Sequence, residues 1–335
     1  MLIDITVVVT TFNEGEYLDS LLSDLGKQEI GGLRVEILLL EAGSYDESRA
    51  KKNLGEMCGV LSFLHSPGLS RTEALNHLFE KAKGSLIVRL DARSHVGNDY
   101  LRRIYELSRD STAENVGGVM APIGCSDEQQ LIADIMRHPL SFGGGKSRNL
   151  SYRGYADSVY LGAYNKEKCV FGSKWFDHIH PKISEDSDLN YRLRANGGKV
   201  FVDSSIIVEH YPRENLKKFF KLCYNYGVGR GLFVLKYRAF SAHRQLAPPL
   251  AVGLLILFFI IGFYLKFFFY LAFVFICIYL AILVYAAVGL RKSLRLTFTA
   301  IVGFFGCHFF WTTGLLVSPL IFRRDVLNLT RKTKA

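Results

Sequence analysis

The sequence lacks the glycine-rich motifs through which many proteins hold a nucleotide. No G-x-G-x-x-G follows the first predicted strand and no G-x-x-x-x-G-K-[ST] occurs, which removes the main support for a dinucleotide-binding or P-loop protein. The six cysteines lack paired spacing, so we expect a reducing compartment and neither a disulfide framework nor a zinc site. The first apolar run contains Asp4 and no basic segment precedes it, so we predict no signal peptide and a cytosolic soluble part.

Acidic residues are scarce just before the longest apolar runs of this 335-residue chain, whose net charge is +10. Between Arg213 and Arg244, eight lysine and arginine residues accompany a single acid, Glu214. Anionic lipid headgroups attract such clusters by about 1 kcal/mol per basic residue. Nucleic acid is the competing partner for a basic patch, but no nucleic-acid-binding motif accompanies this one. We therefore expect membrane lipids as partners, and no nucleic acid.

Through residue 240, strand-like and helix-like apolar patterns alternate. Short aliphatic or β-branched runs predict buried strands at residues 3–10, 35–40, 60–64 and 86–91. Apolar residues at helical spacing lie between these runs, and Ser44 and Ser70, each with a glutamate three residues on, form predicted capping boxes. This β-α-β-α-β-α-β order predicts an α/β domain with a mostly parallel, doubly wound sheet.

Polar residues end three of the predicted strands: Thr11, Glu41 and Asp91. The carboxyl ends of parallel strands share one edge of the sheet, where ligands of open α/β folds bind. A strand-end aspartate can instead cap the following turn, so Asp91 alone does not decide between the two uses. Together the three residues predict a nucleotide-sized crevice at this edge.

Four segments of the sequence resemble, in order, the motifs of family 2 glycosyltransferases with the GT-A fold. They are Val7–Glu14, Leu38–Asp46, Arg89–Arg93 and Ser184–Arg194. Within that family the chain is similar to the succinoglycan-biosynthesis-type transferases, which join a GT-A domain to C-terminal membrane helices. Three segments carry this second likeness: Asp157–Tyr164, Asn190–Arg194 and Tyr226–Arg230. The resemblance covers about residues 3–240.

The resemblance assigns the strand-end residues to a nucleotide-sugar donor. Thr11 and Glu14 would line the base and ribose pocket, and Glu41 stands where the family usually has the aspartate that contacts uracil. Asp91 matches the first aspartate of the D-x-D motif, which approaches the ribose and the metal-bound diphosphate. Arg93 stands where that motif usually ends in a metal-binding aspartate.

The arginine at position 93 bears on the cofactor. In such a site a divalent cation, Mg²⁺ or Mn²⁺, offsets the diphosphate charge and stabilises the leaving group. Arginine can hydrogen-bond phosphate but cannot ligate a metal. Two alternatives follow: Arg93 replaces the cation, or Asp91 and His95 hold it. Metal dependence is open at this point.

The acidic segment Ser184–Asp188 is the strongest candidate for the chemistry. Inverting sugar transfer needs a base for the acceptor hydroxyl, and a carboxylate whose pKa is raised by burial and by neighbouring carboxylates suits that task. By resemblance, Asp186 is the base and Glu185 orients or contacts the acceptor. The segment also fits a helix start, with Ser184 as N-cap and acids in the first turn, and both uses can hold together.

Six further residues, each basic or aromatic, are candidates for contact with the acceptor or a phosphate: Lys146, Arg148, His210, Arg213, Tyr226 and Arg230. The first two follow the glycines at 143–145, which fit either a mobile loop at the acceptor or an ordinary connection. The family often places a histidine and a basic residue near the diphosphate, although His210 fits a surface position equally well. The last two would meet a lipid-linked acceptor at headgroup level.

Apolar runs predict membrane segments at residues 248–265, 267–289 and 296–321. Only Lys266 separates the first two, so they form a predicted hairpin that leaves the basic residues 291–295 in the cytosol. A third full span would place the basic tail outside, against the positive-inside rule. Either the third segment is re-entrant, bent near residues 303–306, or the rule fails here.

These patterns divide the chain into a GT-A domain (1–212), a basic amphipathic segment (213–245), a transmembrane region (246–322) and a basic tail (323–335). In the second of these, Leu216, Phe219 and Cys223 share an apolar face, while lysines lie elsewhere. That pattern is typical of a helix in the membrane interface, with a buried core helix as the alternative.

The predicted function is a membrane-bound inverting hexosyltransferase on the cytoplasmic face of the inner (plasma) membrane. The resemblance implies transfer from a nucleotide sugar, with UDP as the favoured nucleotide, to a polyprenyl-diphosphate-linked saccharide in surface or exopolysaccharide synthesis. One alternative is an enzyme that loads sugar onto polyprenyl phosphate. The other is a non-catalytic membrane scaffold that binds nucleotide sugar or lipid; Arg93 keeps it open, and the intact Glu185–Asp186 pair argues against it.

Overall fold

The computed structural model describes residues 2–169, 175–179, 184–240 and 243–332. The chain divides into two compact units, one of residues 1–123 and 143–212 and the other of residues 124–142 and 213–335. The second unit thus takes in the segment 124–142, which the predicted boundary at residue 212 assigned to the N-terminal domain.

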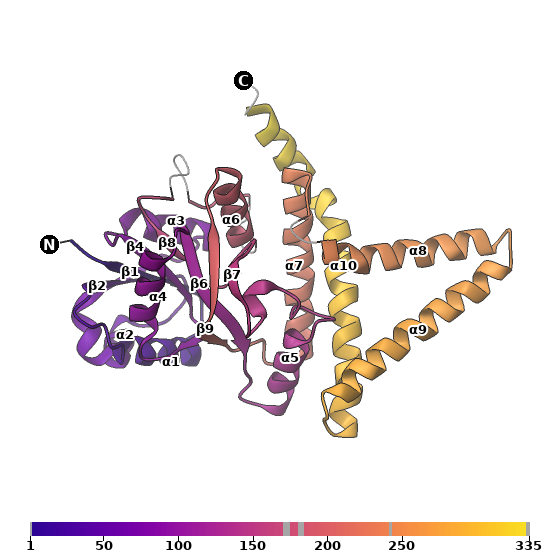
Figure 1. Cartoon of the computed structure of the whole chain (residues 1–335), viewed down its shortest axis with the longest axis horizontal. Coiled ribbons are helices and arrows are strands. Elements are labelled where there is room, and N and C mark those ends of the chain that lie inside the picture. The colour runs from indigo at the N-terminus through magenta and orange to yellow at the C-terminus, as the bar shows by residue number, and fades with distance from the viewer. Residues whose placement is uncertain (1, 170–174, 180–183, 241–242, 333–335) are drawn as a thin grey trace. The chain divides into compact units, whose positions relative to one another are not determined.

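Within its described residues, the first unit is built around one nine-stranded sheet (Figure 1). In chain order the strands are β1 (Ile5–Thr11), β2 (Val35–Glu41), β3 (Leu61–His65), β4 (Leu86–Asp91), β5 (Ser94–Val96), β6 (Asn115–Pro122), β7 (Arg153–Tyr155), β8 (Ala163–Asn165) and β9 (Val200–His210). They lie in the order β3-β2-β1-β4-β8-β6-β9-β5, with β7 also paired to β9. The pairs among β1 to β4 and the pair β6–β9 are parallel, whereas β5, β7 and β8 pair antiparallel. The mostly parallel α/β fold is confirmed.

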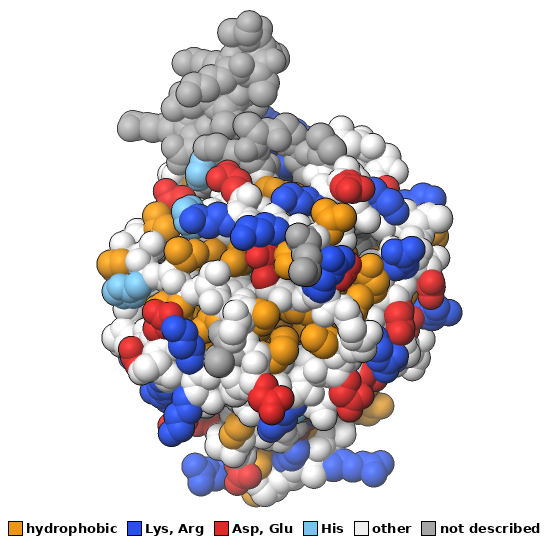
Figure 2. Space-filling view, turned by 90° about the vertical axis from the view of Figure 1, so that its left-hand side faces the viewer, with side chains coloured by type: hydrophobic (Ala, Val, Ile, Leu, Met, Phe, Trp, Pro, Cys, Tyr) orange, Lys and Arg blue, Asp and Glu red, His pale blue; other side chains and the backbone are white. Residues whose placement is uncertain are grey.

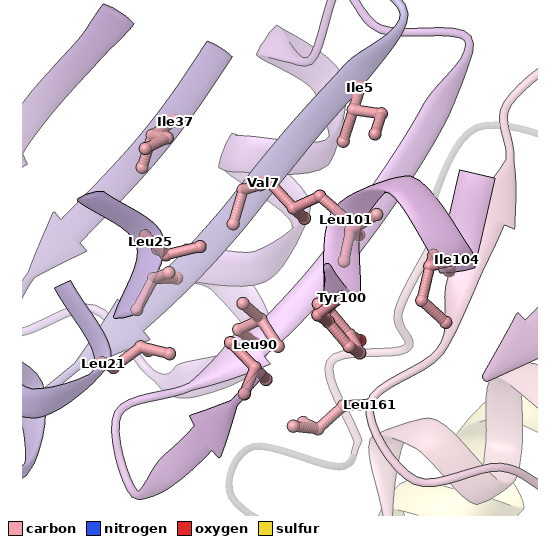
Figure 3. Close-up of a cluster of buried hydrophobic side chains, with 14 of the residues drawn as sticks. Ile5, Val7, Leu21, Leu25, Ile37, Leu90, Tyr100, Leu101, Ile104 and Leu161 are labelled. Atoms are coloured by element: carbon pink, nitrogen blue, oxygen red, sulfur yellow. The ribbon is translucent and has the colours of Figure 1, made fainter. Parts of the chain in front are cut away.

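Helices cover both faces of this sheet. They are α1 (Gly15–Gly26), α2 (Glu47–Leu54), α3 (Arg71–Lys81), α4 (Tyr100–Asp110) and α6 (Glu185–Ala195). Side chains alternate along β1, so Val7 and Val9 pack with α1, α2 and α4, while Val8 packs with α3 and α6. Figure 3 shows the first of these two clusters, to which β1, α1, β2, β4 and α4 all contribute. Buried strands of this kind fix the sheet edge that carries the site.

One predicted capping box is confirmed and the other is wrong. Ser70 caps α3: its side chain accepts from the amide of Glu73, whose carboxylate accepts from the amide of Ser70. The cap of α2 is Asp46, not Ser44, because Asp46 accepts from the amide of Arg49. Both residues lie in the same polar loop, where residue type alone does not fix which one ends the turn.

Charge is spread over the face of the molecule in Figure 2. Among the described residues drawn there, basic and acidic side chains are interspersed rather than gathered by sign.

The second unit is helical in its described residues: α5 (Asp127–Arg137), α7 (Leu216–Tyr237), α8 (Ala247–Gly262), α9 (Phe267–Gly289) and α10 (Leu294–Lys332). By length and composition, α9 and α10 are apolar enough to cross a membrane, and α8 is a shorter apolar helix. The turn between α8 and α9 contains Lys266, as the predicted hairpin requires (Figure 1). The helix α10 continues unbroken through Gly303 and Gly306, so the predicted bend is absent there. Side chains of the predicted basic tail beyond Arg323 lie outside the described residues.

Glycines let α7 and α10 approach closely. A Cβ added at Gly227 would collide with the carbonyl oxygen of Trp311, and one at Gly314 with the carbonyl oxygen of Tyr224. Phe219 on α7 is fully buried. The apolar face of α7 is therefore covered by α10, which favours the buried-helix alternative over an apolar face open to the membrane interface.

Replacement of Gly227 by alanine is expected to destabilise this helix pair by about 1–3 kcal/mol, because the added methyl group meets backbone that cannot turn aside. Thermal unfolding of the purified full chain in detergent measures the effect. Gly253→Ala is the matched control, since a Cβ at Gly253 of α8 meets nothing within 4 Å. Equal melting temperatures for the two variants would contradict the close packing.

Candidate active site

Two buried oxygens mark the carboxyl ends of β1 and β2. Thr11 and Glu41 are register partners and both are buried. Glu41 Oε1 accepts from the amides of Gly43 (2.6 Å) and Asn13 (3.4 Å). Over the part of the chain that the structure describes, Glu41 Oε2 and Thr11 Oγ1 have no hydrogen-bond partner. Buried polar atoms without partners are costly, so this pair indicates a polar ligand at the predicted edge.

The loops after β1 and β2 are joined beside these oxygens. Asn13 has a φ of 54° and its Oδ1 accepts from the amide (3.1 Å) and hydroxyl (3.2 Å) of Ser44. A Cβ at Gly43 would collide with the Asn13 side chain and lie 2.6 Å from Glu41 Oε1. Ser44 thus ties the two loops together instead of capping a helix.

Arg93 and Glu14, both predicted at the donor, lie together. Arg93 Nε donates to Glu14 Oε2 at 2.8 Å, and its Nη1 donates to the carbonyl of Pro212 at 3.0 Å. The Arg93 guanidinium carbon also lies 4.1 Å from the ring centroid of Tyr17. Arg93 is only 9% exposed, so its guanidinium is held in place by protein groups.

An ion-pair network joins β4, α3 and α6, with Arg89 and Glu185 buried and Arg71 and Asp91 partly exposed. Both carboxylate oxygens of Asp91 accept from Arg71 Nη2 at 2.7 Å. Arg89 Nη2 donates to Glu185 Oε1 at 2.8 Å and lies 3.5 Å from Asp91 Oδ1. Arg71 Nε completes the ring 3.2 Å from Glu185 Oε1. This network brings Asp91 together with the predicted catalytic segment of α6. Its link from Arg89 to Glu185 joins residues that are 96 positions apart in the sequence.

The arginines hold Asp91 ionised. Burial by itself raises the pKa of this carboxyl group, but the charges of Arg71 and Arg89 outweigh burial and keep the pKa well below its ordinary value. Asp91 is therefore a permanent anion with two cationic neighbours.

Asp186 differs from the other acids in the first turn of α6. Asp188 is fully buried and accepts from Arg192 Nε at 2.9 Å, and Glu185 is paired with Arg89. Asp186 accepts only from the adjacent amide of Ser187, at 2.8 Å, among the described residues. Burial and the neighbouring Glu185 raise its pKa above the ordinary value. These are the properties of a carboxylate that can take up a proton.

The start of α6 departs from its predicted form. Ser184 stands at the N-cap position, but its backbone is left-handed, with a φ of 70°, and its side chain makes no capping hydrogen bond. Residues 180–183, directly before it, lie outside the described chain. Glu185 and Asp188 of the first turn are thus held by arginines, and Ser184 supplies no side-chain cap.

A divalent cation does not fit the groups that this edge presents. Asp91 has both oxygens bonded to Arg71, and Arg93 replaces the second aspartate. His95 lies away from Asp91: its Nδ1 is 2.6 Å from Asp24 Oδ2 and its Nε2 is 3.8 Å from Glu209. In the described ranges, no three histidine, cysteine, aspartate or glutamate side chains converge to hold a metal. The structure does not support the alternative in which Asp91 and His95 share a cation.

The other predicted residues separate into two groups. His210, at the end of β9, pairs through Nδ1 with the hydroxyl of Tyr160 at 2.9 Å, and it is the smallest of the influences that lower the pKa of Asp91. Lys146 and Arg148 form a short 3₁₀ turn. Lys146 Nζ donates to the carbonyl of Tyr155 on β7 at 3.0 Å, so it does not join the carboxylates.

Three of the predicted acceptor residues belong to the second unit: Arg213, Tyr226 and Arg230. In that unit Tyr226 packs edge-on against Phe142, with ring centroids 5.5 Å apart. The guanidinium of Arg230 lies 5.2 Å from the ring centroid of Phe233. Their predicted contact with an acceptor stays a prediction.

Sequence reasoning missed the two arginines of the ion-pair network. A signal was present for Arg89, because an arginine in the middle of the apolar run of β4 needs a buried anionic partner. Arg71 follows the cap residue of α3 like any first-turn residue, and nothing in its neighbours indicates its contacts.

Comparison with known proteins gives a consistent result. Residues 6–168 match the family described as Glycosyl transferase family 2. The chain is 29% identical over 261 residues to "Succinoglycan biosynthesis protein ExoA" of Rhizobium meliloti (strain 1021), covering 75% of this chain and 77% of that protein. It is 24% identical over 244 residues to "Dolichyl N-acetyl-alpha-D-glucosaminyl phosphate 3-beta-D-2,3-diacetamido-2,3-dideoxy-beta-D-glucuronosyltransferase" of Methanococcus voltae, covering 69% and 74%. Among solved structures, that of S. aureus TarS 1-349 aligns with a TM-score of 0.45 at 14% identity, over 72% of this chain and 68% of that one, too low a similarity for further argument.

Proposed function

We propose that the chain belongs to glycosyl transferase family 2, whose description residues 6–168 match, and that it is a membrane-bound inverting hexosyltransferase of exopolysaccharide synthesis. One observation carries the proposal. Asp186 is the acid of the α6 first turn that forms no ion pair with an arginine among the described residues, and burial beside Glu185 raises its pKa despite the nearby charges of Arg89 and Arg71. A base for a sugar hydroxyl needs those two properties.

The donor is a nucleotide sugar, with UDP as the nucleotide. The unpartnered Thr11 Oγ1 and Glu41 Oε2 support a polar base at the ends of β1 and β2. A donor bound there would extend along the strand ends toward Asp91 of the neighbouring β4. Arg71, beside Asp91, supports binding of a diphosphate, because guanidinium groups donate paired hydrogen bonds to phosphate oxygens.

The acceptor is a polyprenyl-diphosphate-linked saccharide at the cytoplasmic face of the inner membrane. Two helices long and apolar enough to cross a membrane, α9 and α10, support a lipid-borne substrate. Exposed lysines at the start of α7, Lys217, Lys218 and Lys221, support attraction to anionic headgroups. The relative from Methanococcus voltae carries a lipid-linked sugar phosphate in its name.

In the proposed reaction Asp186 accepts the proton of the acceptor hydroxyl while that oxygen bonds to the anomeric carbon. On the opposite side of the sugar ring, the bond from the anomeric carbon to the diphosphate oxygen breaks. The nucleoside diphosphate leaves with the electron pair, and the configuration inverts. Glu185, held by Arg89 and Arg71, positions the first turn of α6 for this step.

Turnover of a panel of nucleotide sugars by the purified full chain, with a crude lipid-linked acceptor, tests this proposal. Transfer of a hexose from a UDP-sugar into the lipid fraction, with an inverted anomeric configuration by NMR, is the expected result. Transfer to polyprenyl phosphate alone would favour the sugar-loading enzyme instead. UDP binding without turnover of any donor would favour the scaffold.

The rate of transfer is expected to fall as the pH is lowered through the pKa of Asp186, because only the deprotonated carboxylate can take the proton. Burial and Glu185 raise that pKa, so the loss begins at a higher pH than for an ordinary aspartate. A pH profile of kcat/KM measures the midpoint. A rate that stays constant down to the range where free aspartate titrates would argue against Asp186 as the base.

A further inference from the structure

We propose that this chain neutralises the donor diphosphate with Arg71 instead of a divalent cation, so that donor binding does not depend on metal. The inference rests on the proposed function and concerns the same site. Arg71 lies outside the D-x-D motif, and the inference gives it the role that a metal ion has in the family pattern.

The first step is the state of Asp91, the residue that would otherwise recruit the cation. Arg71 Nη2 lies 2.7 Å from each of its carboxylate oxygens, and Arg89 Nη2 lies 3.5 Å from Oδ1. A metal at Asp91 would have to displace Arg71 and then lie beside the Arg89 guanidinium. Repulsion between a dication and a fixed, buried guanidinium disfavours that arrangement.

The second step is charge balance. Arg71 and Arg89 carry two positive charges against the two negative charges of Asp91 and Glu185, so the network is neutral as it stands. An arriving diphosphate adds negative charge that a cation must offset. Arg71 can turn from Asp91 to the diphosphate while Arg89 stays beside Asp91, so a guanidinium contacts the phosphate oxygens directly and Asp91 keeps one cationic neighbour.

The third step is access. The Arg71 side chain is 36% exposed, whereas that of Arg89 is 6% exposed, so Arg71 is the member of the pair that a ligand can reach. Among the described residues, Arg71 contacts Asp91 through Nη2 and Glu185 through Nε, and its Nη1 makes no hydrogen bond or ion pair. A guanidinium with an open donor suits bidentate contact with phosphate.

The position of Arg71 adds to this. It is the first residue of α3, whose positive end favours a phosphate. The Ser70–Glu73 capping box fixes that end of the helix. Arg93 is held by the Glu14 carboxylate and the Pro212 carbonyl, so Arg71 is better placed than Arg93 to exchange its protein partner for a phosphate.

Calorimetric titration of the purified full chain with UDP and with uridine tests the proposal, because the difference between the two ligands isolates the diphosphate. For the unaltered protein, we expect the preference for UDP over uridine to be the same in excess EDTA and in excess MnCl₂. For Arg71→Gln, we expect UDP affinity to fall about 10- to 100-fold with uridine affinity unchanged. Arg71→Lys keeps the positive charge but not the paired donors of the guanidinium, so its UDP affinity should lie between those of the unaltered protein and Arg71→Gln.

Arg153→Gln is the matched control, since it removes an exposed arginine paired with Asp203 on β9, outside the site. A UDP preference that EDTA abolishes and Mn²⁺ restores would overturn the inference, as would an Arg71→Gln variant with its UDP preference intact. Should Arg71→Gln fail to fold, the EDTA comparison on the unaltered protein decides alone. Binding of neither uridine nor UDP would instead contradict the proposed donor.

Discussion

Asp186→Asn is expected to lower the rate of sugar transfer by about 10²–10⁴-fold, the contribution typical of a positioned general base. The change removes the proton acceptor and keeps the size of the side chain. Among the described residues, Asp186 forms no hydrogen bond or ion pair with an arginine. The substitution therefore leaves the network of Arg71, Asp91, Arg89 and Glu185 intact. The dissociation constant for UDP should therefore be unchanged.

Initial rates and calorimetric UDP binding, measured on the same preparation, separate catalysis from binding. Asp127→Asn is the matched control, because Asp127 is likewise an acid in the first turn of a helix, α5, which lies outside the site. It should retain full activity. A rate within tenfold of the unaltered enzyme for Asp186→Asn would place the base elsewhere.

Arg89→Met is expected to reduce the free energy of unfolding by about 3–5 kcal/mol, because it leaves Glu185 buried with a single remaining cation. Side-chain exposure is 6% for Arg89 and 4% for Glu185, so water cannot replace the lost hydrogen bond. Thermal unfolding of the full chain in detergent measures the loss.

Two further variants define that effect. Arg34→Met removes an arginine from an exposed pair with Asp4 and should cost less than about 1 kcal/mol. Arg89→Met combined with Glu185→Gln removes both buried charges and should regain part of the stability, since an uncompensated charge is the main cost. If Arg89→Met lost no more free energy of unfolding than Arg34→Met, the buried Arg89–Glu185 pair would contribute little to stability.

Local patterns were sufficient for the elements that carry the donor edge. The β-branched run of β1 and the aliphatic run of β2 are buried on both faces, and the register that pairs Thr11 with Glu41 follows from their parallel alignment. The capping box at Ser70 is likewise a contact between near neighbours in sequence, which is why it was predictable.

Contacts between distant segments were not predictable in the same way. The link from Arg89 to Glu185 spans 96 residues, and no periodicity encodes it. The short strands β5 and β7 are three residues each, too short for an alternation to be read, and both depend on pairing with β9. The amphipathic start of α7 gave the right face but not what covers it, because a neighbouring helix and a membrane both accept apolar side chains.

The helix α5 is synthesised well before α10, the helix of the second unit that covers it. Its Leu131, Ile132 and Ile135 are fully buried, and a Cβ at Gly303 of α10 would lie 2.5 Å from Ile135 Cδ1. Asp134 of α5 also pairs with Lys292, at 2.9 Å. At the usual rate of translation, α5 leaves the ribosome on the order of ten seconds before α10 is made. During that interval its apolar face has no native cover, so a nascent or truncated chain that ends near residue 212 would expose an aggregation-prone helix until α10 or a chaperone covers it.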